Sequence, residues 1–290
     1  MPRIAIIGGG SIGEALLSGL LRAGRQTKDM VVAEKNPTRA KFLAETYSVL
    51  TTSVIDAAEN AAYVIVAVKP SDVTSVIDEI ADAAAKAEND SVEQVVVTVV
   101  AGVSTAFYES KLPAGSPVVR VMPNAPIVVG GGISALAAGR FATAEQLAEV
   151  STIFDAVGGV LTVPESQLDA VTALSGSGPA YFFLMAEALV DAGVASGLPR
   201  PVATDLVAQT MAGSAAMLLE RLDSGPSVGD SSMGVGMDTS PASLRATVTS
   251  PGGTTAAGLR ELERGGFRAA VADAVAAAKT RSEQLGITSE

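Results

Sequence analysis

The sequence contains no cysteine and no histidine among its 290 residues. Without cysteine, the chain cannot form disulfides, thiolate nucleophiles or cysteine-ligated zinc sites. Without histidine, it has no imidazole general base and no Ser-His-Asp triad. Any catalysis must therefore rely on Ser, Thr, Tyr, Lys, Asp, Glu, backbone dipoles or a bound cofactor, and we expect no metal site.

Basic residues and long apolar runs are also scarce. Twenty Lys and Arg stand against 31 Asp and Glu, which gives a net charge of −11. An acidic chain without a basic run argues against nucleic acid or an anionic membrane surface as a partner. The most apolar run, Val95–Val103, is too short and too β-branched for a transmembrane helix. Nothing near the N-terminus resembles a signal peptide, so we expect a cytoplasmic protein.

Glycine, by contrast, is abundant, and its pattern near the N-terminus is informative. Ile4–Ile7 has the composition of a buried strand, and Gly8, Gly10 and Gly13 follow it with G-x-G-x-x-G spacing before a helical pattern. In a strand–turn–helix, the first glycine permits a tight turn, the second lets the backbone approach a pyrophosphate, and the third lets the helix pack on the strand. A chance match is the alternative in a chain with 29 glycines. The position between strand and helix favours dinucleotide binding.

Further apolar runs predict a sheet. They lie at residues 30–33, 63–68, 95–100 and 118–122, with possible edge strands at 133–138 and 159–163. Continuous apolar strands alternating with helices are typical of a parallel, doubly wound sheet, whose ligands bind beyond the carboxyl ends of the strands. We therefore predict an α/β fold, with an N-terminal Rossmann domain built on such a sheet over residues 1–164.

The second part of the chain has a different pattern. Ala-rich helical segments are predicted at residues 168–192, 200–222, 254–264 and 267–285, and residues 223–242 form a long polar loop. Small side chains allow close approach of helices, so we predict an all-helical C-terminal dimerisation domain over residues 165–290. A compact monomeric bundle is the alternative.

Polar residues follow the predicted strands. Glu34 lies where an acidic residue usually receives the ribose hydroxyls of NAD, but Lys35, Asn36 and Arg39 crowd the same turn and offer partners for a 2′-phosphate. The sequence leaves the choice between NAD and NADP open at this point. Lys69-Pro70 stiffens a loop where a nicotinamide can lie, although a plain strand-ending turn explains it equally well.

Two segments of the helical part carry chemistry. Thr172–Tyr181 places two glycines and a proline within a helical region, where they reduce stability. Val248–Thr255 has adjacent glycines and hydroxyls at a helix start, where Ser250, Thr254, Thr255 and free N–H groups suit a small carboxylate. Ordinary helix capping is the alternative for this second segment.

These segments together resemble pyrroline-5-carboxylate reductase along essentially the whole chain. The resemblance rests on the glycine loop, on Ala67–Pro70, Arg120–Asn124 and Asp169–Tyr181, and on Thr249–Thr255 and Gly265–Arg268. It implies reduction of L-1-pyrroline-5-carboxylate to L-proline with NADPH or NADH, the last step of proline biosynthesis. It also implies a homodimer that builds each active site from two subunits, often with further assembly.

The resemblance also implies roles for individual residues. Thr255 matches the proposed proton donor, while Ser250, Gly253 and Thr254, with Thr255, match positions that hold the substrate carboxylate. Glu165 matches an acidic position near the substrate ring nitrogen. The positions expected to contact the cofactor are Gly8, Gly10, Ser11, Ile12, Gly13, Asn36, Ala67, Val68, Lys69, Pro70, Val100, Ala101 and Gly102.

Some residues depart from the family pattern. Ser11-Ile12 replaces a usual Asn-Met, and Ala246 stands where Asp is common, which bears on cofactor preference. We predict an NADPH-preferring enzyme, with NADH as a possible second cofactor. The alternatives are a reductase of another cyclic imine and a non-catalytic NAD(P)-sensing protein. The Ser250–Thr255 segment disfavours the sensor, which needs no carboxylate site.

Overall fold

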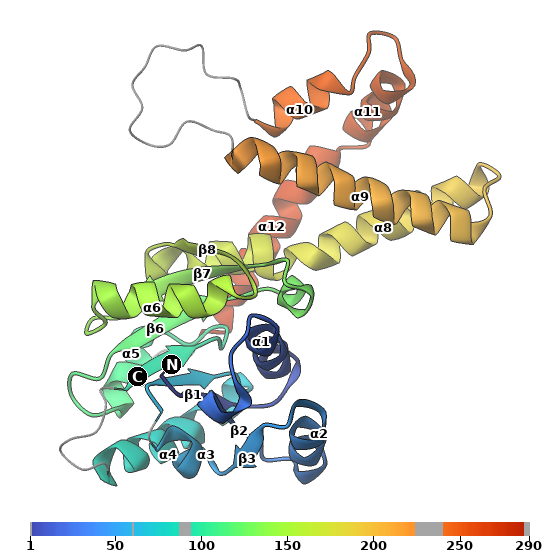
Figure 1. Ribbon diagram of the computed structural model, residues 1–290. Coiled ribbons are helices and arrows are strands. Elements are labelled where there is room, and N and C mark those ends of the chain that lie inside the picture. The colour runs from blue at the N-terminus through green and yellow to red at the C-terminus, as the bar shows by residue number, and fades with distance from the viewer. Residues whose placement is uncertain (1, 60, 87–93, 224–239, 287–290) are drawn as a thin grey trace. The chain divides into compact units, whose positions relative to one another are not determined.

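The computed structural model describes residues 2–59, 61–86, 94–223 and 240–286. Its packing divides the chain into two compact units (Figure 1). Unit 1 comprises Met1–Pro179 and Val275–Glu290, and unit 2 comprises Ala180–Ala274. The units are defined by contacts within the chain, and the predicted domain boundary at residue 165 falls inside unit 1.

Unit 1 is built on one sheet. Among the described residues its strands are β1 (Ile4–Ile7), β2 (Met30–Ala33), β3 (Leu50–Thr52), β4 (Tyr63–Val66), β5 (Val95–Thr98), β6 (Val118–Met122), β7 (Gly132–Ala138) and β8 (Gly158–Thr162). They lie in the order β3-β2-β1-β4-β5-β6-β7-β8. The pairs from β3 to β6 are parallel, β7 runs antiparallel to β6, and β8 runs parallel to β7. The strand order reverses direction between β1 and β4, the usual position of a ligand crevice in such sheets.

Helices cover both faces of this sheet, as Figure 1 shows. They are α1 (Ser11–Arg22), α2 (Pro37–Tyr47), α3 (Val54–Ala58), α4 (Val73–Lys86), α5 (Thr105–Lys111), α6 (Ala144–Asp155) and α7 (Leu168–Val171). Leu16, Leu20 and Phe154 from α1 and α6 pack on one face. Ile77 from α4 and Tyr108 from α5 pack on the other. A parallel sheet buried on both faces explains why its strands are continuously apolar.

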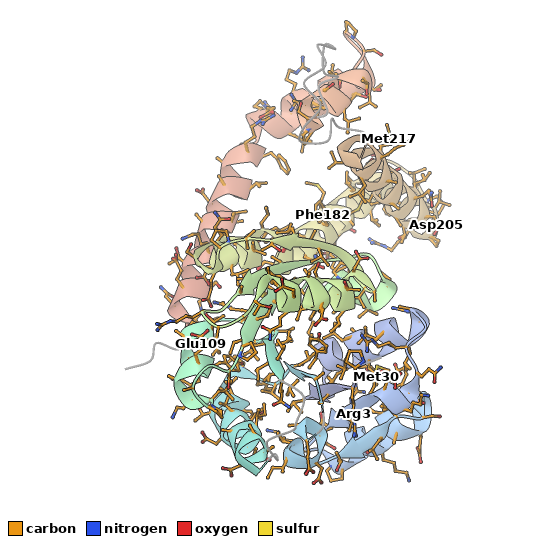
Figure 2. All side chains as sticks on the ribbon, turned by 60° about the vertical axis from the view of Figure 1, so that its left-hand side comes forward. Arg3, Met30, Glu109, Phe182, Asp205 and Met217 are labelled. Atoms are coloured by element: carbon orange, nitrogen blue, oxygen red, sulfur yellow. The ribbon has the colours of Figure 1, made fainter. Side chains whose placement is uncertain are left out.

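Unit 2 is helical. It contains most of α8 (Gly178–Ala195), then α9 (Arg200–Asp223), α10 (Pro241–Thr247), α11 (Thr254–Arg264) and the first part of α12 (Phe267–Gln284). Large apolar side chains stay exposed here: Phe182 is 64% exposed and Met217 is 48% exposed, whereas Met30 lies buried in the sheet unit (Figure 2). A surface of this kind normally contacts another protein or a membrane.

Two segments of the described residues are long and apolar enough to cross a membrane by length and composition. They are Glu165–Ala195 and Arg200–Glu220, and 11% and 6% of their most apolar windows are buried. The continuous apolar run at residues 95–103, which is too short for a transmembrane helix, is not one of these two segments. The alanine-rich helices pass this test because alanine adds apolar character without forming such a run.

Most predicted elements are confirmed with small shifts at their ends, and α11 has the predicted bounds. The sequence missed β3, and the predicted helix 168–192 is three elements: α7, a π-helical segment at Thr172–Gly176, and α8. The predicted polar loop at 223–242 lies outside the described residues except at its ends.

Candidate functional site

The glycine loop between β1 and α1 has the geometry that its spacing predicts. Gly8 has a φ of +104°, and a Cβ built on it would lie 2.6 Å from the carbonyl oxygen of Ala67. A Cβ on Gly13 would lie 1.9 Å from the carbonyl oxygen of Gly8. Only glycine fits at these two positions, because a side chain would collide with backbone.

Gly10 differs from its neighbours. A Cβ on Gly10 would meet nothing within 4 Å among the described atoms, so packing within the protein does not require glycine there. Gly10 is the N-cap of α1, and no side chain in the described structure caps it. The N–H groups of the first helical turn are therefore available to an anion, and the space beside Gly10 is where a pyrophosphate can approach. The residues present thus fit a dinucleotide.

Hydrogen bonds fix the loop on both sides of Gly9. Its N–H donates to Glu34 Oε2 at 2.8 Å, and its carbonyl accepts from Arg39 Nε at 2.7 Å. Arg39 also pairs with Glu14 on α1. Burial alone would raise the pKa of Glu14, but hydrogen bonds from Arg39 and Tyr47 outweigh it and lower that pKa below its ordinary value. The Arg39 guanidinium, predicted as one partner for a 2′-phosphate, is therefore engaged with the loop and α1.

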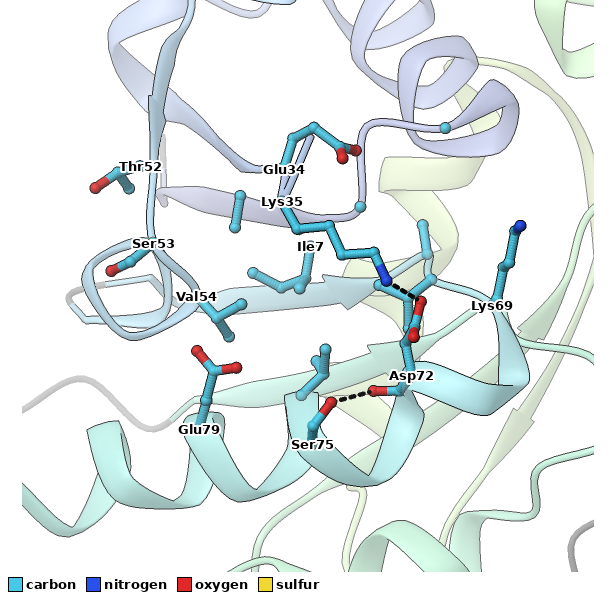
Figure 3. A pocket seen from close by; sticks show the side chains of 16 residues that line it. Ile7, Glu34, Lys35, Thr52, Ser53, Val54, Lys69, Asp72, Ser75 and Glu79 are labelled. Atoms are coloured by element: carbon cyan, nitrogen blue, oxygen red, sulfur yellow. Dashed lines mark hydrogen bonds and ion pairs between the residues drawn. The ribbon is translucent and has the colours of Figure 1, made fainter. Parts of the chain in front are cut away.

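A cavity of about 430 Å³ opens beside this loop (Figure 3). It lies at the carboxyl ends of β1, β2 and β4. The Lys35 side chain extends along it, and Lys35 Nζ pairs with Asp72 Oδ2 at 2.7 Å. Its lining includes the predicted cofactor residues Gly8, Gly10, Ala67, Val68 and Lys69, together with Glu34, Lys35, Thr52, Ser53, Val54, Asp72, Ser75, Val76 and Glu79. The lining contains both apolar and polar side chains, so the apolar and the polar groups of a nucleotide can both find partners there.

The other predicted cofactor residues are not among those that line the cavity. Ser11, Ile12 and Gly13 open α1, and Pro70 follows Lys69 in a short 3₁₀ turn. The Asn36 side chain accepts from the N–H groups of Thr38 and Arg39 and caps α2. Asn36 is therefore the N-cap of α2, and its amide nitrogen is the part left for a ligand.

Val100, Ala101 and Gly102 lie in the loop between β5 and α5. Gly102 has a φ of +75°, and a Cβ on it would lie 2.8 Å from the carbonyl oxygen of Leu285, just after α12. The end of α12 thus lies against this loop inside unit 1. No local sequence pattern indicates this contact, because it joins residues far apart in the chain.

The segment Thr172–Tyr181 contains the π-helical turn. Asn124, just after β6, donates from Nδ2 to the Ser175 carbonyl at 3.2 Å and accepts the Ile133 N–H at 2.9 Å. A Cβ on Gly176 would lie 3.0 Å from Met122 Cε. The end of β6 therefore supports the turn, and single π-turns often mark functional sites.

The predicted substrate residues lie in two units. Ser250, Gly253, Thr254 and Thr255 lie in unit 2, where the Gly253 N–H donates to the Ser250 carbonyl at 3.0 Å and Gly253 is the N-cap of α11. Thr254 and Thr255 are exposed on the first turn, and within the described residues no side chain caps the helix. Glu165 lies in unit 1, and its carboxylate accepts hydrogen bonds from Thr105 and Arg120.

Known proteins are similar to this chain over its full length. A family model described as pyrroline-5-carboxylate reductase dimerisation matches residues 165–285, and one described as NADP oxidoreductase, coenzyme F420-dependent, matches residues 3–102. The pyrroline-5-carboxylate reductase of Mycobacterium tuberculosis is 72% identical over 100% of this chain and 99% of its own length. That of Corynebacterium melassecola is 44% identical over 99% of each chain.

The chain belongs to the pyrroline-5-carboxylate reductase family.

Solved structures agree with this assignment. The pyrroline-5-carboxylate reductase of Coxiella burnetii has a TM-score of 0.86 and 34% identity over 99% of each chain. The pyrroline carboxylate reductase of Plasmodium falciparum, solved with NADP bound, has a TM-score of 0.80 and 27% identity over 99% of this chain and 98% of its own. The predicted family, the fold class and the enzyme class, an NAD(P)-dependent oxidoreductase, are confirmed.

Proposed function

We propose that this chain reduces L-1-pyrroline-5-carboxylate to L-proline, with NADPH as the cofactor and NADH as a possible second one. One observation carries the proposal: the match to proteins of this name covers both the nucleotide-binding part and the helical part of the chain. The cavity beside the glycine loop supports cofactor binding, because Gly10 leaves space there and the first turn of α1 has free N–H groups.

Such a reaction needs little acid or base catalysis from the protein's side chains. When bound, the reduced nicotinamide supplies a hydride to the carbon of the substrate's C=N bond, which is a strong acceptor when its nitrogen is protonated. The remaining work is to hold the ring, orient the carboxylate and exclude water. An active site without histidine is therefore chemically reasonable.

The proposed substrate site is the start of α11. Ser250 and Thr254 offer hydroxyls, and the helix N-terminus offers N–H groups and a positive dipole end to the substrate carboxylate. We assign Thr255 the role of orienting the ring nitrogen through Oγ1, which can accept a hydrogen bond from the protonated imine and donate one to the amine nitrogen that hydride transfer leaves. A threonine hydroxyl is too weak an acid to protonate the imine itself. The Ser250–Thr255 turn and the exposure of both threonines support this assignment.

We also infer that the protein is a soluble homodimer formed through its helical part. Residues 165–285 match the dimerisation model, and that range includes the exposed apolar helices α8 and α9. A second copy with the same helices covers such a surface by symmetry, and homodimers are the commonest oligomers. Further assembly of dimers, as implied by the sequence resemblance, stays a prediction.

The direct test is oxidation of NADPH and of NADH, followed by the loss of reduced-nicotinamide absorbance, with pyrroline-5-carboxylate as substrate. The proposal predicts rapid oxidation and formation of proline. Turnover only with a six-membered cyclic imine would assign a different substrate, because the same residues serve both rings. Cofactor binding without oxidation by any imine would support the sensing alternative.

A further inference from the structure

The loop between β5 and α5 is anchored at its start by a buried threonine. Thr98 is 0% exposed, and its Oγ1 accepts the N–H of Val100 at 3.2 Å while donating to the Tyr108 hydroxyl at 2.7 Å. Tyr108, a residue of α5, is itself fully buried. These buried hydrogen bonds therefore fix the direction in which the chain leaves β5.

The end of the same loop is anchored by Glu165. Thr105 donates its backbone N–H to Glu165 Oε1 at 2.8 Å and its hydroxyl to Glu165 Oε2 at 2.7 Å. Arg120 on β6, only 7% exposed, donates to Glu165 Oε1 at 3.2 Å. One carboxylate thus takes both donors of the first residue of α5, and a buried guanidinium balances its charge. Hydrogen bonds to a charged group are among the stronger ones in proteins.

The middle of the loop is confined by the end of α12. Gly102 approaches the Leu285 carbonyl so closely that a Cβ would be 2.8 Å from the oxygen. Ser282 Oγ, one turn earlier, donates to Asp169 Oδ1 at 2.6 Å and so holds the end of α12 against α7. Glu165 and Leu285 are the first and last residues matched by the dimerisation model. Two ends of the dimerisation segment therefore hold one loop of the nucleotide-binding part.

We propose that Glu165 is a positioning residue for the Val99–Ser104 loop and acts on the reaction through Thr105, instead of contacting the substrate. This rests on the proposed function and on the sequence resemblance, which implies that Val100, Ala101 and Gly102 contact the cofactor. The carboxylate is directed to Thr105 and Arg120, and its side chain is 27% exposed. On this placement, a shift of the loop would displace the nicotinamide end of the cofactor. The adenosine end would be held elsewhere, by the cavity that Glu34 and Lys35 line.

The test compares binding of the whole cofactor with binding of its adenosine end in the full-length protein. Glu165→Gln keeps the size of the side chain but removes its charge and exchanges one acceptor for a donor. We expect the Kd for NADPH to rise about tenfold and kcat to fall, since small misplacements of reacting groups cost up to about a hundredfold in rate. The Kd for 2′,5′-ADP should change less than about twofold.

Four further variants test whether the effect is specific to the contact between Glu165 and Thr105. Thr105→Val removes the hydroxyl and should reproduce the pattern, Thr105→Ser should restore wild-type values, and the double variant with Glu165→Gln should be no worse than either alone. The matched control is Glu109→Gln on α5, whose carboxylate accepts the Arg140 N–H at 2.6 Å. It should leave both dissociation constants unchanged.

Other outcomes would overturn the proposal. A raised KM for pyrroline-5-carboxylate with an unchanged Kd for NADPH would make Glu165 a direct substrate ligand. Equal weakening of NADPH and 2′,5′-ADP would show general damage to the sheet unit. The binding measurements contain no substrate, so failure of wild-type turnover with pyrroline-5-carboxylate would count against the proposed function and not against the loop assignment.

Discussion

Glu34, at the end of β2, accepts the N–H of Gly9 in the glycine loop through Oε2 at 2.8 Å. Its other oxygen, Oε1, accepts the N–H of Asn36 at 2.8 Å. The carboxylate is therefore held in one orientation at the rim of the cavity, with Lys35 and Asp72 paired beside it (Figure 3). A fixed negative charge at this point acts on any phosphate that approaches the end of β2.

Glu34→Gln should therefore raise the ratio of kcat/KM for NADPH to that for NADH. Removing one like charge several ångströms from a phosphate is worth about 1 to 3 kcal/mol, so we expect the ratio to rise about tenfold. Steady-state kinetics with both cofactors measure it. Glu79→Gln, which removes a charge from α4 in the same cavity, is the matched control and should change the ratio less. An unchanged ratio in Glu34→Gln would mean that this charge does not meet the 2′-phosphate.

Gly10→Ala should weaken cofactor binding without lowering the stability of the fold. The added methyl group meets no described atom within 4 Å, so we expect the midpoint of thermal unfolding to stay within a few degrees of wild type. The same methyl group occupies the space for the pyrophosphate, so the Kd for NADPH should rise about tenfold or more. Gly131→Ala, on a loop with only an ordinary contact at 3.9 Å, should change neither value. Unaltered cofactor affinity in Gly10→Ala would place the pyrophosphate elsewhere.

The sequence predicted the parts of this structure that depend on local pattern. The buried strands and the glycine loop were found because apolar runs and glycine spacing report their structure directly. The strand β3 was missed, since Leu50–Thr52 is short, partly exposed and held by pairing with β2. The hydrogen bonds of Glu165 to Thr105 span 60 residues, and no local pattern reports them. The only sequence signal near the π-helical turn at 172–176 is the presence of glycines in a segment predicted to be helical.

Thr255→Ala should lower kcat about a hundredfold, in the range for loss of a proton-donating or proton-orienting group. The cofactor Kd should stay within about twofold of wild type, because Thr255, on α11, is assigned to the substrate's ring nitrogen and not to the cofactor. Thr255→Ser keeps the hydroxyl and should retain most activity. Steady-state kinetics and cofactor titration measure these effects. A Thr255→Ala enzyme with wild-type kcat would show that another group serves the ring nitrogen.

Phe183→Glu should break the proposed dimer. Phe183 on α8 is 70% exposed in the chain alone, and a carboxylate there would be buried without a partner in an apolar interface. Sedimentation velocity should show monomers, and turnover should fall because the resemblance implies a site shared by two subunits. Leu50→Glu, at a 58% exposed position on β3, should remain dimeric and active. A dimeric Phe183→Glu protein would exclude this part of α8 from the interface.

Tyr108→Phe should make stability less sensitive to alkaline pH. Burial raises the pKa of Tyr108 from 10.0 to about 12, although the Thr98 hydroxyl and the Arg120 charge act in the opposite direction. Above about pH 10 the unfolded chain loses this proton while the folded chain keeps it, so the stabilisation is complete below pH 10 and is lost as pH rises toward 12. The loss amounts to at most roughly 3 kcal/mol for this shift.

Urea unfolding of both proteins between pH 8 and pH 11 measures this effect, and the difference between them cancels the other tyrosines. At pH 8 the variant should be less stable by about 1 kcal/mol, because Thr98 loses its acceptor. As the pH rises, that deficit should shrink, since Phe has no proton to lose and only the wild type is penalised. A deficit that stays constant up to pH 11 would mean that Tyr108 ionises in the folded protein as readily as in the unfolded chain.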